Sequence, residues 1–336
     1  MVKVGIIGYG YWGPNLARNF FGNPRAELKY IADNRQERLK LAGQLYPKTV
    51  FTETPHQVMN DPEVDAVIIA TPVFSHYELA KEALQKGKHV LLEKPMTASS
   101  KDALALIDLA EEKGLSLMVD HTFLYNGAVR KIKDLVEDNT VGNIQYFDST
   151  RINLGLFQPD INVLWDLAPH DISILLHVIE EKPISVQSTG ISHTDNGLEN
   201  IAYMSLKYKD GIIAHFNCSW TSPVKIRMIL IGGDKKMLVY NDMEASEKVK
   251  VYDTGYEVKS DADKQKILVD YRAGDIYVPK LDTTEALKYM SEDFIASILD
   301  GIQPLSNNTL GYQVVRIIEA AEESLRNGSK EILLNF

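Results

Sequence analysis

A glycine-rich turn directly after a short apolar strand is the feature that most constrains this chain. Residues 2–7 read Val-Lys-Val-Gly-Ile-Ile, and glycines follow at positions 8, 10 and 13. In such a pattern the first glycine permits a tight turn, the second lets a pyrophosphate approach the backbone, and the third lets a helix pack close to the strand. The segment predicts a dinucleotide-binding turn formed by Gly8, Gly10, Tyr11, Trp12 and Gly13.

An acidic residue stands where this type of turn requires one. Asp33 ends the second predicted strand, 20 residues beyond Gly13, where a carboxylate accepts hydrogen bonds from the adenosine ribose hydroxyls. Its charge repels a 2′-phosphate and favours NAD. Arg35 is the type of side chain that accommodates such a phosphate, so NADP stays open as the cofactor. Without the glycines, Asp33 would read equally well as the cap of the next helix.

Short apolar runs alternate with helix-period segments over the first 120 residues, which is typical of a parallel sheet covered by helices. The first and fourth runs are almost continuous Val and Ile, as in strands buried on both faces. We expect a doubly wound α/β domain over residues 1–121, with strands at 2–7, 28–32, 49–51, 66–70, 89–92 and 117–119.

After Tyr125 the pattern changes from strands joined by helices to strands joined by turns. Lys209-Asp210-Gly211 and Gly232-Gly233-Asp234 each separate two strand-like runs, and both are hairpin signals that indicate an antiparallel sheet. One helix is expected before these strands, at 128–137, and two after them, at 285–299 and 310–325. We therefore expect an α+β domain over residues 122–336.

Charge and cysteine usage limit the partners of the chain. The 336 residues carry a net charge of −10, which has the wrong sign for binding nucleic acid or anionic lipid. No apolar run reaches the ~18 residues of a membrane span, and the first residues do not resemble a signal peptide. The single cysteine, Cys218, fits a reducing compartment, so we expect a cytoplasmic protein.

Polar residues follow the fourth and fifth predicted strands, at the sheet edge where a dinucleotide lies. Thr71 and Pro72 are expected to line the cofactor cleft, and His76 is a candidate contact that could equally be an ordinary first-turn helix residue. Glu93 and Lys94 end the fifth strand. Pro95 restricts the backbone of Lys94 and is a candidate for a cis bond, which would fix the direction of the lysine.

A second cluster of chemically active side chains begins at Asp166, where the sequence reads Asp-Leu-Ala-Pro-His-Asp. Asp166 is expected to cap a helix and to place Pro169 in its first turn. His170 would then lie near the helix start, beside a carboxylate four residues away, as a neutral imidazole suited to general base catalysis. A metal site built from Asp166, His170 and Asp171 lacks a remaining ligand set, and we expect no metal.

Taken together, the glycine turn, Ala70-Thr71-Pro72 with His76, Glu93-Lys94-Pro95, and Asp166 with His170 make the chain resemble the Gfo/Idh/MocA oxidoreductases. The resemblance implies a Rossmann domain followed by a domain with a large open, mostly antiparallel sheet that is often used to form homodimers or homotetramers. It also implies that Lys94 and His170 are catalytic and that Asp166 accompanies His170.

The resemblance implies an NAD(P)-dependent enzyme that moves a hydride between nicotinamide and a secondary alcohol of a sugar, cyclitol or sugar nucleotide. A sensor without turnover, or a sugar–sugar oxidoreductase that keeps NADP bound, are the alternatives on the same fold. The segment Asn162-Val163-Leu164-Trp165 departs from the glycine-rich lead-in common in the family, which leaves the pocket shape open. Candidate substrate contacts are Tyr125, Arg151 and Asn153.

Overall fold

Six parallel strands form the first sheet in the order β3-β2-β1-β4-β5-β6. The computed structural model describes residues 1–155, 157–158, 160–253, 255–257, 270–272 and 274–336. The strand order reverses at β1 and β4, so the doubly wound parallel sheet predicted from the sequence is confirmed. The strands are β1 (Val2–Ile7), β2 (Ala26–Ala32), β3 (Val50–Thr52), β4 (Ala66–Ile69), β5 (His89–Glu93) and β6 (Leu117–Asp120).

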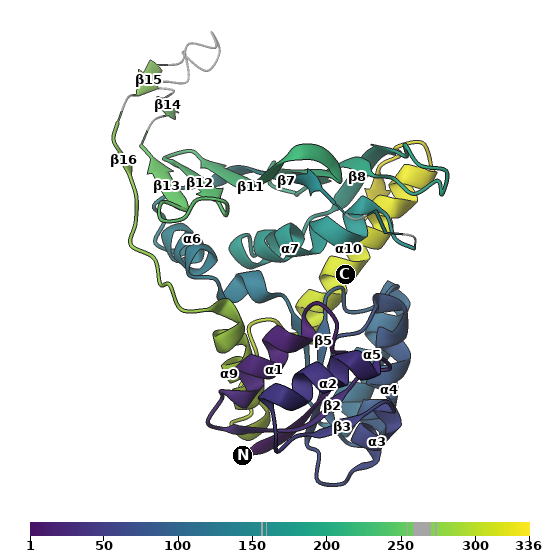
Figure 1. Ribbon diagram of the computed structural model, residues 1–336. Helices are drawn as coiled ribbons and strands as arrows, with labels where there is room; N and C mark the ends of the chain where they lie inside the picture. Colours follow the sequence, from purple (N-terminus) through teal and green to yellow (C-terminus); the bar gives the residue numbers. More distant parts are fainter. Residues whose placement is uncertain (156, 159, 254, 258–269, 273) are drawn as a thin grey trace. The chain divides into compact units, whose positions relative to one another are not determined.

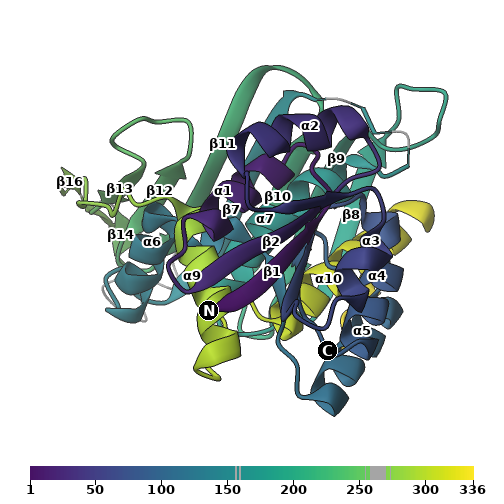
Figure 2. The same ribbon diagram turned by 60° about the horizontal axis from the view of Figure 1, so that its bottom comes forward.

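Helices cover both faces of this sheet, which explains the continuous apolar runs of β1 and β4. Figure 2 shows α1 and α2 on one face and α3, α4 and α5 on the other. These helices are α1 (Gly13–Phe21), α2 (Gln36–Leu45), α3 (Pro55–Asn60), α4 (His76–Gln85) and α5 (Ser100–Lys113). Over the described residues, no helix has the length and apolar character needed to cross a membrane.

A segment from the end of the chain belongs to the same compact unit as the first sheet. Contacts group Met1–Asn126 with Thr284–Arg316, and Gly127–Thr283 with Ile317–Phe336. This grouping differs from the simple division expected at residue 121, because α9 (Ala286–Leu299) packs on α1. Ion pairs reinforce that packing: Arg18 binds Glu285 at 2.6 Å and Arg25 binds Asp300 at 2.7 Å. Helix α10 (Asn308–Arg326) continues from one unit into the other.

The second unit is built on a nine-stranded sheet in the order β16-β13-β12-β11-β7-β10-β9-β8-β17 (Figure 1). Every pairing is antiparallel except that of β7 with β10, so the predicted, mostly antiparallel sheet is confirmed. Its strands are β7 (Ile144–Leu154), β8 (Ser185–Ile191), β9 (Ile201–Lys207), β10 (Ile213–Ser219), β11 (Thr221–Gly233), β12 (Met237–Asn241), β13 (Val249–Tyr252), β16 (Ile276–Tyr277) and β17 (Ile332–Leu333). Strands β14 (Gly255–Glu257) and β15 (Asp270–Arg272) form a separate pair.

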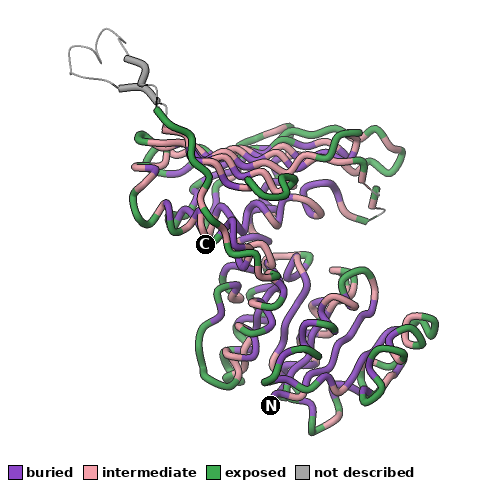
Figure 3. The backbone as a smooth tube through the Cα atoms, turned by 60° about the vertical axis from the view of Figure 1, so that its left-hand side comes forward, coloured by how far each residue is buried: buried purple, intermediate pink, exposed green. Residues whose placement is uncertain are grey.

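One face of the nine-stranded sheet holds the core of the second unit. Helices α6 (Gly127–Glu137) and α7 (Val163–Val178) lie along this face in Figure 1. The side chains that point to it are fully buried, among them Phe147, Phe216 and Ile231. Along these strands buried residues alternate with half-buried or exposed ones (Figure 3). The alternation follows from the two-residue period of a strand, which sends successive side chains to opposite faces.

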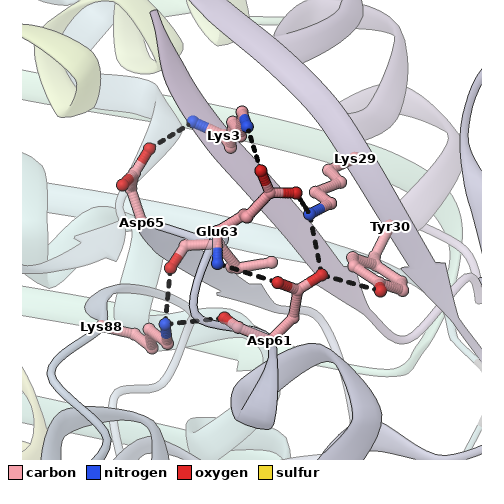
Figure 4. Close-up of polar contacts among 8 residues, drawn as sticks. Lys3, Lys29, Tyr30, Asp61, Glu63, Asp65 and Lys88 are labelled. Carbon is pink, nitrogen blue, oxygen red and sulfur yellow. Dashed lines mark hydrogen bonds and ion pairs between the residues drawn. The ribbon is translucent and has the colours of Figure 1, made fainter.

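A network of ion pairs fixes the loop between α3 and β4, at the sheet edge opposite the carboxyl ends of the strands (Figure 4). Lys29 Nζ lies 2.8 Å from Asp61 Oδ2 and 2.5 Å from Glu63 Oε2. Tyr30 also donates to Asp61, at 2.9 Å. The buried Lys88 donates to the backbone carbonyls of Asp61 and Val64, at 2.9 and 2.7 Å. These contacts give the loop a structural role.

Replacing Asp61 by Asn is expected to lower the free energy of unfolding by about 1–2 kcal/mol at pH 7. The hydrogen bond from Lys29, the backbone N–H of Glu63 and the hydroxyl of Tyr30 lower the pKa of Asp61 to about 2. A carboxylate whose native pKa is depressed stabilises the fold above its unfolded pKa, and this contribution disappears as the pH falls through the native value. Urea unfolding of both proteins should therefore show a difference that shrinks between pH 4 and pH 2. Glu63→Gln, at an exposed neighbour, should change stability less.

Candidate functional site

The glycine turn adopts the close-packed geometry that its sequence predicts. Gly8 has a φ of +98°, and a Cβ there would lie 2.4 Å from the carbonyl oxygen of Ala70. A Cβ on Gly13 would lie 2.6 Å from the carbonyl oxygen of Gly8, so both positions exclude any larger residue. Gly10 faces open space instead, with its nearest neighbour, an Arg35 nitrogen, 3.7 Å from the position of a Cβ. Backbone at Gly10 is thus accessible to a bound anion.

Asp33 is held rigidly at the end of β2. Its Oδ2 accepts the backbone N–H of Tyr9 at 2.7 Å, and its Oδ1 accepts the backbone and Nε of Arg35, both at 2.9 Å. Burial acts to raise the pKa of this carboxyl, but the hydrogen bonds from Arg35 and Tyr9 outweigh it and the pKa is lowered. The residue is therefore a charged, fixed acceptor at physiological pH.

A cavity of about 810 Å³ runs along the carboxyl ends of β1, β2, β4 and β5. Ten of the predicted cofactor residues line it: Gly8, Gly10, Tyr11, Trp12, Asp33, Arg35, Thr71, Pro72, Glu93 and Lys94. Gly13 and His76 do not. Exposed aromatic side chains stand at the rim, with Tyr11 85% and Phe74 71% exposed. The volume and the apolar walls are those of a pocket for a small-molecule ligand.

Nine further residues line the cavity that the sequence analysis did not assign to it: Ile7, Ala32, Asn34, Glu53, Pro55, Ala70, Phe74, Ser75 and Leu79. Glu53 and Pro55 follow β3, so the rule that ligands lie at the carboxyl ends of parallel strands could have found them. Phe74 and Leu79 follow β4, in η1 (Val73–Ser75) and α4, where nothing in their own sequence pattern distinguishes them from ordinary helix residues.

His76 is buried behind the cavity wall. Its two ring nitrogens lie 2.9 Å from the carbonyl oxygen of Pro95 and 2.8 Å from that of Thr71. Burial lowers the pKa of this imidazole despite these acceptors, so the neutral ring donates to one carbonyl only. The Lys94–Pro95 peptide bond is cis. His76 thereby connects two wall segments, and its contact with a cofactor stays a prediction.

Two carboxyl groups lie beside Lys94. Glu93 and Asp120 are direct partners across the β5–β6 ladder and are both buried. Burial, followed by the proximity of Asp120, raises the pKa of Glu93, and burial raises that of Asp120 to about 6. Burial and the nearby Lys94 lower the pKa of His121 to about 3. Lys94 is thus a half-buried cation beside two buried carboxyl groups whose pKa values are both raised.

The helix that carries His170 begins earlier than the sequence analysis expects. Asn162, not Asp166, is the N-cap of α7, and its side chain accepts the backbone N–H groups of Leu164 and Trp165. The expectation that Asp166 caps the helix and that Pro169 lies in its first turn is therefore wrong. Pro169 lies inside the helix, and the proximity of His170 to the helix start no longer argues for a neutral imidazole.

Asp166 and His170 share one face of α7, because residues four apart on a helix are neighbours. Both are half-buried. Trp220, which follows β10, donates its indole N–H to Asp166 Oδ2 at 2.9 Å. No local pattern around this tryptophan indicates that contact. The pair on α7 and Lys94 belong to different units of the chain, and their meeting at one substrate stays a prediction.

The structure gives two of the candidate substrate residues partners within the protein. Arg151 is 3% exposed and forms a buried pair with Asp171, with Nε 2.9 Å from Oδ2. Tyr125 is buried and donates to Asp293 at 2.6 Å. Asn153 lies half-buried near the end of β7. Their contacts with a substrate stay predictions.

Within the ranges of the chain given above, no group of three or more His, Cys, Asp or Glu side chains is placed to hold a metal ion.

Comparison with known proteins matches both halves of the chain. A family model described as an oxidoreductase family with an NAD-binding Rossmann fold matches residues 2–121, and a model of the GFO/IDH/MocA C-terminal domain matches residues 129–239. The first result agrees with the strands, the turn and the cavity described above.

Among curated relatives, an uncharacterized oxidoreductase of Escherichia coli, YdgJ, is 32% identical over 50% of this chain and 51% of its own length. The scyllo-inositol 2-dehydrogenase (NADP(+)) IolW of Bacillus subtilis is 27% identical over 69% of this chain and 63% of its own. The first two matches thus span about half to two thirds of the relatives' lengths.

UDP-N-acetylglucosamine 3-dehydrogenase of Acidithiobacillus ferrooxidans is 29% identical over 65% of this chain and 67% of its own. The solved structure of the UDP-N-acetylglucosamine 3-dehydrogenase GnnA from that organism covers 98% of this chain and 99% of its own, at 22% identity and a TM-score of 0.80. This likeness shows that the two chains share their fold.

Proposed function

The chain belongs to the Gfo/Idh/MocA oxidoreductase family, and we propose that it is an NAD(P)-dependent dehydrogenase that acts on a secondary alcohol of a sugar, cyclitol or sugar nucleotide. One observation carries the proposal: a single cavity has a fixed ribose acceptor, Asp33, and a catalytic candidate, Lys94, in its lining. Relatives named for scyllo-inositol and for UDP-N-acetylglucosamine support the choice of substrate class.

The residues of the cavity fit a dinucleotide. Gly8 and Gly13 pack so tightly that a side chain would clash, whereas Gly10 leaves its backbone open to a pyrophosphate. Asp33 presents charge to the ribose hydroxyls and favours NAD. Arg35, half-exposed and bound to that carboxylate, could turn to a 2′-phosphate, so NADP remains a possible second cofactor.

The proposed chemistry divides between two side chains. His170 takes the proton of the substrate hydroxyl as general base, and Asp166 orients its imidazole. In this proposal Lys94 stabilises the negative charge that develops on the same oxygen. Glu93, whose carboxyl accepts the Lys94 backbone N–H at 3.1 Å, keeps the lysine in place. Bound NAD supplies the acceptor for the hydride.

Turnover tests the proposal directly. Purified protein would be assayed at 340 nm with NAD and NADP side by side, against free hexoses, inositols and UDP-sugars. We expect reduction of NAD with at least one of these alcohols. A protein that binds NAD but reduces it with none of them would favour the sensor, and one that purifies with bound NADP and needs two sugars would favour the sugar–sugar oxidoreductase.

We also propose that the enzyme forms a homodimer or homotetramer through the sheet face opposite α7. Side chains on that face include half-exposed apolar residues: Tyr203 and Ile213 are 44% and 48% exposed, and Leu230 is half-buried. An apolar sheet face of this kind is typical of an interface. Light scattering should give the molar mass of two or four chains, and Leu230→Glu should reduce it. A monomeric wild-type protein would contradict the proposal.

For the compartment we propose the cytoplasm. Cys218, the single cysteine of the chain, is buried, and burial raises the pKa of its thiol far above the usual range. The thiol is therefore unreactive, and the fold uses no disulfide that would need an oxidising environment.

A further inference from the structure

We infer that Trp220 is a positioning residue of the reaction, whose indole N–H holds the Asp166 carboxylate where it can orient His170. The inference rests on the proposed function, because Trp220 acts only through the Asp166–His170 pair. Trp220, Asp166 and His170 all belong to the second unit.

The contact itself has the geometry of a strong hydrogen bond. Trp220 Nε1 lies 2.9 Å from Asp166 Oδ2, and the tryptophan is 1% exposed. An indole N–H can only donate, and when buried it requires an acceptor. A carboxylate is the strongest acceptor that a side chain offers, so the bond fixes the position of that oxygen.

The indole of Trp220 is tightly packed. A Cβ on Gly155 would lie only 2.4 Å from Trp220 Cδ1 and 2.9 Å from Cγ, so the ring rests directly on the glycine backbone. The backbone N–H of Gly155 donates to the Trp220 carbonyl at 3.0 Å, and the Trp220 N–H donates to the Asn200 carbonyl at 3.0 Å. The ring of Phe157 lies 5.8 Å away, centroid to centroid. These contacts with the backbone of Gly155 and Asn200 and with the ring of Phe157 fix the direction of the indole N–H.

Such an anchor matters because of where Asp166 lies. Its side chain is half-buried on α7, and an aspartate side chain has several staggered rotamers. Orientation of an imidazole by a carboxylate requires that the carboxylate keep one rotamer, and small displacements of catalytic groups are costly. The hydrogen bond from Trp220, which does not belong to α7, favours one rotamer of Asp166.

The test is a double-mutant cycle on turnover, with NAD and an alcohol that the panel above identifies. Trp220→Phe keeps an aromatic ring at this position but removes the N–H donor. We expect kcat to fall about 10- to 100-fold, which is the range for a hydrogen bond to a charged group. The Kd of NAD, measured by fluorescence titration, should stay within twofold. In an Asp166→Ala background the same change should have no further effect on kcat, because its target is gone.

Two more variants test whether a loss of kcat comes from the Trp220–Asp166 hydrogen bond and not from general disruption of the packing around it. Cys218→Ala alters a buried side chain of β10, two residues before Trp220 and close enough to Asp166 for that charge to act on its thiol, and should leave kcat within about twofold. Gly155→Ala would displace the indole by steric overlap and should lower kcat as Trp220→Phe does, even if the latter folds poorly.

The outcomes separate this inference from the function it rests on. Trp220→Phe with kcat within twofold of the wild type, or with an equal loss in the Asp166→Ala background, would overturn the role of Trp220 and leave the dehydrogenase proposal intact. Absence of turnover with every alcohol of the panel would overturn both.

Discussion

Replacing His170 by Ala should lower kcat by about 10²- to 10⁴-fold, the usual contribution of a positioned general base. The variant keeps the cavity of the first unit, since none of the residues that line it lies on α7. The Kd of NAD should therefore be unchanged. Steady-state turnover and NADH fluorescence titration measure the two quantities separately.

His177 offers a matched control for this change. It lies on the same helix, near its end, and burial lowers the pKa of its imidazole. His177→Ala removes an equal number of atoms and should keep kcat within about twofold. Equal activity of His170→Ala and the wild type would remove the general base from the mechanism.

Replacing Lys94 by Met should lower kcat by about 10²- to 10³-fold, the effect of removing one group that stabilises a developing oxyanion. Methionine keeps an apolar chain in the cavity without its charge. The change also removes the cation that lowers the pKa of Glu93 and Asp120, so both acids should bind protons more tightly. The variant should therefore remain folded at neutral pH.

Circular dichroism and turnover together test this prediction. Lys86→Met, at an exposed position after α4, removes the same charge from the first unit and should leave kcat unaltered. A Lys94→Met variant that is folded and fully active would show that the lysine does not touch the reacting oxygen.

Local pattern predicted the elements of the fold but not all of their partners. Strands β1 and β4 are continuous apolar runs because helices cover both faces, and Gly211, with a φ of +85°, marks the turn after β9. The parallel pairing of β7 with β10 joins strands about 60 residues apart, and no local signal specifies it. Likewise, the apolar residues of α9 predict a buried helix face but not the unit on which that helix packs.

The site shows the same limit. The glycine turn and Asp33 were predictable because the chemistry of a pyrophosphate and a ribose fixes their spacing. The cap of α7 was misplaced because both Asn162 and Asp166 are good cap residues, and a proline at 169 favours the later start. Trp220, the residue between β10 and β11, bonds to Asp166 on α7, a contact that only tertiary structure creates.

Because residues 284–316 belong to the first unit, no single continuous fragment of the chain contains that unit alone. A fragment that stops at residue 126 would lack α9, and with it the carboxylates that neutralise Arg18 and Arg25 and the Phe294 ring that packs on Phe20. Expression of a nucleotide-binding half alone would require splicing the late segment behind the early one. Anyone assembling chimeras of these enzymes should therefore exchange the two segments together.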